Sequence, residues 1–154
     1  MNDKAFMDRL EDVLDALGMC SFEPPLTVDY RFGSFESRLG IWHCFVRRDD
    51  IERTGNYIEI RSDRVYWIAL EYPGLQPFMQ DLKAASIKSS KNLGRLHSVT
   101  FILAVEDLPS AERQQLRQTF DEYRNSLWAG TYNELLIWDT HELCELEKRY
   151  QTTG

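Results

Sequence analysis

Two short apolar runs separated by a helical segment constrain the fold of this chain more than any other feature. Residues 98–105 (SVTFILAV) and 134–138 (ELLIW) are almost wholly apolar, which is typical of strands buried on both faces. Residues 109–128 between them carry apolar side chains at helical spacing. A strand, a helix and a second strand in this order form a right-handed crossover with parallel strands. A final helix, capped by Asp139, extends the predicted C-terminal unit to β-α-β-α.

The N-terminal half predicts a helix and then antiparallel strands. Residues 3–17 place apolar side chains on one helical face, and Gly18 stands where a C-terminal cap is expected. Stretches rich in β-branched and aromatic residues predict four strands, at 26–32, 39–47, 56–61 and 64–72. We expect these strands to form an antiparallel meander, with Ser62–Asp63 as the hairpin turn between the last two. A second helix is predicted from Pro77 to about Asn92.

Together these elements predict an α/β (α+β) fold with a mixed sheet. The sheet is expected to contain the N-terminal antiparallel meander and the strands of the C-terminal β-α-β-α unit, with helices on both faces. The chain shows no internal repeat, low-complexity segment or linker. A single domain spanning residues 1–154 is therefore expected.

Composition indicates a cytoplasmic protein. No apolar run approaches the ~20 residues that a membrane helix needs, and the N-terminal segment is acidic and amphipathic, unlike a signal peptide. The three cysteines, Cys20, Cys44 and Cys144, are an odd number and widely spaced. Such spacing is more typical of reduced thiols than of a disulfide framework.

Charge favours a basic partner. The net charge is −7, from 25 acidic and 18 basic residues, and a field of this sign repels nucleic acid and attracts cations. One strip runs against the trend, with no acid between residues 82 and 105: Lys83, Lys88, Lys91 and Arg95. On a helix these cations could hold phosphates, or they could simply favour the negative end of the helix dipole.

Two acid-containing triplets point to a second interpretation. Glu59-Ile60-Arg61 places an acid and a base two residues apart on a strand, with Asp49 or Asp50 as an upstream acid. Alternatively, Glu71-Tyr72-Pro73 places an acid at a strand end before a helix.

With these triplets, the order of a helix, a strand meander, a helix and a further strand over residues 3–138 resembles the PD-(D/E)XK nuclease superfamily. The resemblance implies two acids that hold Mg²⁺ or Mn²⁺, which activates water, and a lysine that orients the attack. In this chain arginine or proline stands at the lysine position. Arginine keeps its proton at all accessible pH values and is a poor substitute for a lysine that exchanges one. The resemblance therefore implies a nuclease or an inactivated relative.

The sequence contains no motif for a zinc site, for nucleophilic catalysis or for a phosphate-binding loop. The histidines and cysteines supply at most two ligands at one place, fewer than the four of a structural zinc site. No nucleophile elbow or glycine-rich phosphate loop occurs. The sequence therefore predicts no metal and no cofactor outside the nuclease alternative.

Tyrosines next to acids suggest a protein-binding surface. The residues expected on this surface are Tyr57, Tyr66 and Tyr72 with Glu36, Glu59 and Glu71. Aromatic side chains among carboxylates suit an arginine-rich partner. We therefore expect a non-catalytic acidic module that binds a basic or nucleic-acid-binding protein, possible examples being inhibitors of the immunity or anti-defence type. The alternative is the metal-dependent nuclease, with Glu59, Arg61, Glu71 and Asp50 at its site and the basic strip holding phosphates.

Overall fold

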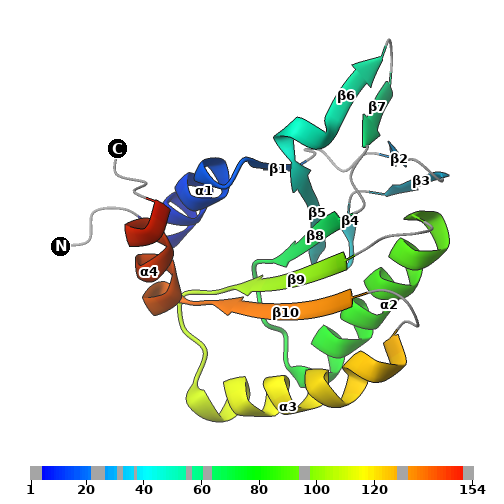
Figure 1. The fold of residues 1–154 in the computed structure, drawn as a ribbon. Helices are drawn as coiled ribbons and strands as arrows, with labels where there is room; N and C mark the ends of the chain where they lie inside the picture. The colour runs from blue at the N-terminus through cyan, green and yellow to red at the C-terminus, as the bar shows by residue number, and fades with distance from the viewer. Residues whose placement is uncertain are drawn as a thin grey trace.

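Two β-sheets and four α-helices make up the described part of the chain (Figure 1). The computed structural model describes residues 5–21, 27–30, 33–36, 38–54, 57–60, 64–93, 98–127 and 132–150. The main sheet has the strand order β1 (Met19–Ser21), β5 (Trp42–Arg47), β8 (Arg64–Ala69), β9 (Ser98–Ala104) and β10 (Tyr132–Trp138), and β4 (Arg38–Leu39) also pairs with β5.

The main sheet is mixed, as predicted. Strands β1, β5 and β8 pair antiparallel, whereas β8, β9 and β10 are parallel neighbours. Helices α2 (Leu75–Leu93) and α3 (Ser110–Leu127) form the crossovers between the parallel strands. The α/β fold class, its antiparallel N-terminal part and its C-terminal β-α-β-α unit are thereby confirmed.

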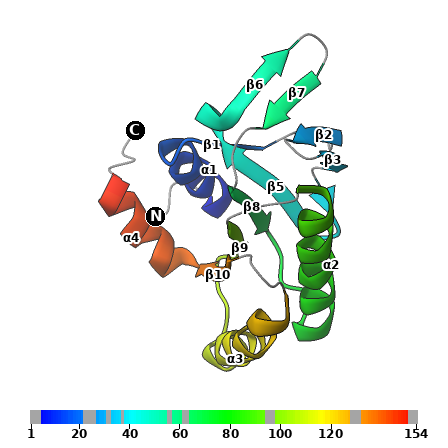
Figure 2. The same ribbon diagram turned by 45° about the vertical axis from the view of Figure 1, so that its right-hand side comes forward.

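Helices cover both faces of the main sheet, which also confirms the prediction (Figure 2). Helices α2 and α3 pack on one face, where Trp42 contacts Phe78 and Phe101 with ring centroids 5.1 and 5.2 Å apart. Helices α1 (Phe6–Ala16) and α4 (Thr140–Tyr150) pack on the other face. Within the described ranges, none of these helices combines the length and apolar character needed to cross a bilayer.

An arginine fork joins the two helices on the second face. The guanidinium of Arg9 in α1 donates from Nε and Nη2 to the two carboxylate oxygens of Glu147 in α4, at 2.9 and 2.6 Å. A bidentate pair of this kind fixes orientation as well as distance. Arg9 therefore sets how α1 and α4 lie over the sheet.

Two predicted helix ends are confirmed. Gly18 follows α1 with a φ of 74°, and its N–H donates to the carbonyl of Asp15 at 2.9 Å. Asp139 directly precedes α4 and caps it, because its carboxylate accepts the backbone N–H of Glu142 at 2.9 Å. Glycine tolerates the left-handed conformation and aspartate satisfies a free helical N–H, so both residues are placed for local reasons.

The pairing predicted for the N-terminal strands is wrong in part. A second sheet has the order β3 (Gly33–Glu36), β2 (Thr27–Tyr30), β7 (Tyr57–Ile60) and β6 (Ile51–Thr54). The expected 56–61 and 64–72 hairpin does not form, because β7 and β8 belong to different sheets; Ser62–Asp63 lies outside the described residues.

The partner of β7 explains the difference. Strand β7 pairs antiparallel with β6, with Thr54 opposite Tyr57. Only Gly55 and Asn56 separate the two strands, and such a pair favours a tight hairpin. This local pairing competes successfully with the Ser-Asp turn, which lacks a glycine.

A glycine turn divides the strand predicted at 39–47. Gly40 has a φ of 58° between β4 and β5, and a methyl group there would overlap the carboxylate of Asp81 in α2. That carboxylate accepts the backbone N–H of Ile41 at 3.2 Å. The turn is therefore fitted closely against α2.

Two glycine-to-alanine substitutions separate these effects. Gly18→Ala introduces left-handed strain alone, because nothing lies within 4 Å of the added methyl group, and should cost about 1 kcal/mol. Gly40→Ala adds displacement of Asp81 and should cost about 2–3 kcal/mol. Urea unfolding of both variants measures the two losses, and equal losses would contradict the close fit at Gly40.

Candidate functional site

Exposed carboxylates gather at the carboxyl ends of the parallel strands. The loops that follow β8 and β9 lie side by side, because Ala69 pairs with Leu103. The exposed acids in these loops and in the first turn of α3, which we call the acidic edge, are Glu71, Glu106, Asp107 and Glu112. Residues 70–74 and 105–112 contain no lysine or arginine. The acidic edge therefore has no compensating charge within its own loops.

Two large side chains lie within the acidic edge. Leu70 is 40% exposed, one of the few large apolar side chains with that much exposure in the described ranges. Tyr72 is half-buried and packs on Phe78, with ring centroids 5.3 Å apart. Burial, and after it the negative charge of Glu112, raises the pKa of Tyr72 above its ordinary value. The edge thus combines carboxylates with apolar and aromatic contact area.

Asp139 lies at the same end of the sheet but is neutralised. Its carboxylate pairs with Arg113 in the first turns of α3. Burial favours the neutral acid, but the N–H of Glu142 and the Arg113 guanidinium outweigh it and hold the pKa of Asp139 below its ordinary value. Asp139 therefore supports α4 rather than adding to the acidic edge.

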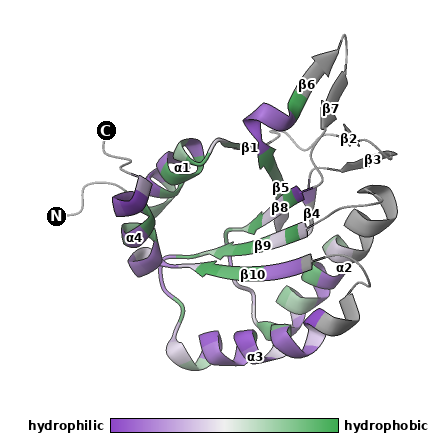
Figure 3. Cartoon of the chain, viewed as in Figure 1, coloured by the Kyte–Doolittle hydropathy of each residue, from purple (hydrophilic) through white to green (hydrophobic). Residues whose placement is uncertain are grey.

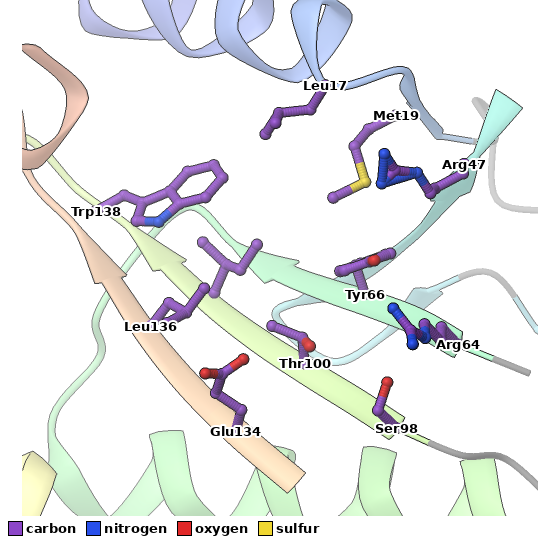
Figure 4. A pocket seen from close by; sticks show the side chains of 11 residues that line it. Leu17, Met19, Arg47, Arg64, Tyr66, Ser98, Thr100, Glu134, Leu136 and Trp138 are labelled. Carbon is purple, nitrogen blue, oxygen red and sulfur yellow. The ribbon is translucent and has the colours of Figure 1, made fainter. Parts of the chain in front are cut away.

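A cleft lies over the same parallel strands. It has a volume of ≈ 380 Å³ and lies on the face that carries α1 and α4, over the amino-terminal parts of β8 and β9 and along β10 as far as Trp138 (Figure 4). Its polar lining comprises Arg47, Arg64, Tyr66, Ser98, Thr100 and Glu134. Its apolar lining comprises Leu17, Met19, Ile102, Leu136 and Trp138. The volume falls within the usual range of small-molecule sites, about 300–1,000 Å³.

The six residues expected on one protein-binding surface occupy three places. Glu71 and Tyr72 belong to the acidic edge, and Tyr66 lines the cleft. Tyr66 packs with the α1–α4 core and Tyr72 with the α2–α3 core, so the two rings lie on opposite faces of the main sheet. Strand β8 ends at Ala69, and the chain then turns toward α2. This turn places Tyr72 on the α2 face of the sheet, where it packs on Phe78.

The other three residues belong to the second sheet. Glu36 is in β3, and Tyr57 and Glu59 are in β7. Backbone register pairs Glu59 with Asp29 on one side and with Glu52 on the other. Three acidic residues therefore occupy one cross-strand row, a pattern that sequence order alone does not reveal.

Two of the acids considered for a metal site, Asp50 and Glu71, lie far apart. Strands β5 and β8 are antiparallel, so the end of β5 neighbours the start of β8. Asp50 comes just after β5 and lies near that end, whereas Glu71 comes just after the other end of β8. Six strand residues at ~3.3 Å each separate them by about 20 Å, so one ion cannot bind both. Arg61 lies outside the described residues. Among the residues whose side chains the structure describes, which do not include those of β2, β3 and β7, no three His, Cys, Asp or Glu form a group suited to a metal ion.

The basic strip begins on α2. Helix α2 extends to Leu93 and so includes Lys88 and Lys91, three residues apart as predicted, while Arg95 lies outside the described residues. Lys83 is exposed, and its ammonium lies 5.5 Å from the centroid of the Tyr123 ring in α3. A cation–π contact of this kind links the two helices.

Of the residues that line the cleft, the sequence had indicated only Tyr66 as a candidate. The run at 98–105 reads as apolar, yet Ser98 and Thr100 alternate with Val99 and Phe101. The same polar alternation opens β8 at Arg64 and Tyr66, and Figure 3 shows β10 changing from hydrophilic to hydrophobic along its length. Comparing the starts of the three strands would have indicated one polar half-face.

No protein-family model, curated protein or solved structure matches this chain.

The electrostatic field of the acidic edge can be measured at Tyr72. Glu112→Gln removes the nearby negative charge and should lower the pKa of Tyr72 toward its ordinary value, because the tyrosinate becomes less disfavoured. Ultraviolet titration gives the pKa, with Tyr72→Phe identifying its signal among the other tyrosines. An unchanged pKa would contradict the proximity of the two side chains.

Asp139 should contribute to acid sensitivity. A depressed carboxyl pKa stabilises the fold above the unfolded value of about 3.9 and is lost as the pH falls through the folded value. Asp139→Asn keeps a capping oxygen but cannot titrate, so the unfolding free energy should fall less steeply below about pH 4. Urea unfolding at neutral and acidic pH tests this, and an unaltered slope would refute it.

Proposed function

We propose that this protein is a non-catalytic module that binds a basic protein partner through the acidic edge. The observation that carries the proposal is the arrangement of four exposed carboxylates around the exposed Leu70, without a basic residue in the same loops. Carboxylates steer a cationic partner toward the surface. Leu70 and Tyr72 then supply the contact area that anchors it.

The global charge supports the same partner. A net charge of −7 raises the encounter rate with a basic protein and lowers it with nucleic acid. In open α/β sheets, ligands commonly bind outside the carboxyl ends of the strands, where the acidic edge lies. A cytoplasmic inhibitor of a basic or nucleic-acid-binding protein, of the immunity or anti-defence type, is the form of this function that we propose.

One observation favours the alternative, a nuclease or inactivated relative that uses Mg²⁺ or Mn²⁺. The row of Asp29, Glu59 and Glu52 places acidic residues on three adjacent strands about 5 Å apart. Acidic residues opposite each other on neighbouring strands are unfavourable, and a divalent ion would offset that cost. Plasmid cleavage with Mn²⁺ that is present in wild type and lost in Glu59→Gln would favour this alternative; our first proposal expects no cleavage.

Site-specific photo-crosslinking tests the first proposal. Benzoylphenylalanine at position 70 should crosslink a basic protein in the source cell, whereas the same group at position 7 should not. Leu70 and Met7 are matched in exposure, each at 40%, but Met7 lies on α1 away from the acidic edge. Equal crosslinking from both positions would contradict docking at the edge.

Paired charge variants give an independent reading of the same site. Glu106→Gln with Asp107→Asn removes two adjacent acids from the edge and should weaken the captured partner's binding about tenfold, most strongly at low salt. Asp121→Asn with Glu122→Gln removes two adjacent exposed acids from α3 and leaves the edge intact. Equal affinity of the two double variants, measured by surface plasmon resonance, would refute the proposed site.

A further inference from the structure

We propose that the cleft on the α1–α4 face binds a small amphipathic anion, with its anionic group between Arg47 and Arg64 and its apolar body toward Trp138. The cleft shares no lining residue with the acidic edge, and its arginines lie near the amino-terminal end of β8 (Figure 4). The inference therefore does not depend on the proposed function.

Cross-strand register orders the cleft into rows of different chemistry. The first row holds Arg64 and Ser98, and the second holds Tyr66, Thr100 and Glu134. The third row is wholly apolar, with Ile68, Ile102 and Leu136. Helices α1 and α4 pack on the apolar rows and leave the polar rows open. A ligand lying along the strands therefore meets charge at one end and an apolar surface at the other.

The two arginines define the charged end. The antiparallel ladder between β5 and β8 ends at Phe45 and Tyr66, and Arg47 and Arg64 each lie two residues beyond this pair on their own strands. Both are exposed and both line the cleft. The two side chains bring two positive charges to one end of the cleft, and a guanidinium can donate two parallel hydrogen bonds to a carboxylate or phosphate.

Glu134 restricts the ligand to one anionic group. It lies two strands away from Arg64, about 10 Å across the sheet. This carboxylate would repel a second negative charge on the ligand. It could instead accept a hydrogen bond from a donor group on the ligand. The remaining wall is apolar and is formed by Leu17 after α1, by Met19 in the edge strand β1, and by Leu136 and Trp138 on β10. A monoanion with an apolar body fits all three regions.

Calorimetric titration with three simple probes tests the ligand class. Octanoate carries both the charge and the apolar body, octan-1-ol lacks the charge, and inorganic phosphate lacks the apolar body. We expect octanoate to bind at least about tenfold more tightly than either of the others, because only octanoate contacts both ends of the cleft. Octanoate that binds no more tightly than octan-1-ol, or does not bind, would overturn the proposal.

Charge variants locate the site. Arg47→Gln and Arg64→Gln should each weaken octanoate binding about tenfold and leave octan-1-ol binding unchanged. Arg149→Gln, at an exposed position of α4, removes the same charge elsewhere and should have no effect. Thermal unfolding of each variant checks that the fold is retained. Unchanged octanoate affinity in both cleft variants would refute the site.

A comparison of two peptides identifies the source of such an anion. Acetyl-Ala-Ala-Leu with a free carboxylate is compared with the same peptide amidated. Tighter binding of the free acid than of octanoate indicates the carboxyl terminus of another protein, and the reverse order indicates a small metabolite. Both results support an amphipathic carboxylate, and equal binding of the acid and the amide peptide together with failure of octanoate overturns it.

Discussion

Burial of three parallel strands on both faces is the constraint on which the rest of this structure depends. Strands β8, β9 and β10 cannot pair directly through hairpins, so α2 and α3 cross over between them and pack on one face. The other face is closed only over its carboxyl-terminal half, by α1 and α4. This unequal coverage leaves an acidic edge where the strands end and an arginine-bearing cleft where they begin.

Local patterns predicted most of the fold. Helical spacing, Gly18 and Asp139 located α1 and α4, and the apolar runs located β9 and β10. The assignment of strands to sheets could not be read in the same way, because residues 57–60 are compatible with pairing on either side. The choice depends on which neighbouring strands compete for the pairing in space. The sequence shows only the local preference of each segment for a strand or a turn.

The candidate sites were less predictable for a related reason. Glu71 and Tyr72 stood out as acid beside aromatic, but their neighbours at the acidic edge come from a loop more than thirty residues later. Ser98 and Thr100 were concealed within an apolar run, since the alternation that distinguishes two faces occupies only four residues. Register between strands brings such residues together, and register is a property of the whole sheet.

The Arg9–Glu147 fork has a consequence for how the chain matures. The two residues are 138 positions apart, so α1 emerges from the ribosome long before its partner helix exists. Until then the apolar face of α1, including Leu10, Val13 and Leu14, lacks the surface that buries it in the finished fold. Contacts of such long sequence separation form late in folding. The nascent chain therefore carries an exposed apolar helix during most of its synthesis, a natural binding target for chaperones.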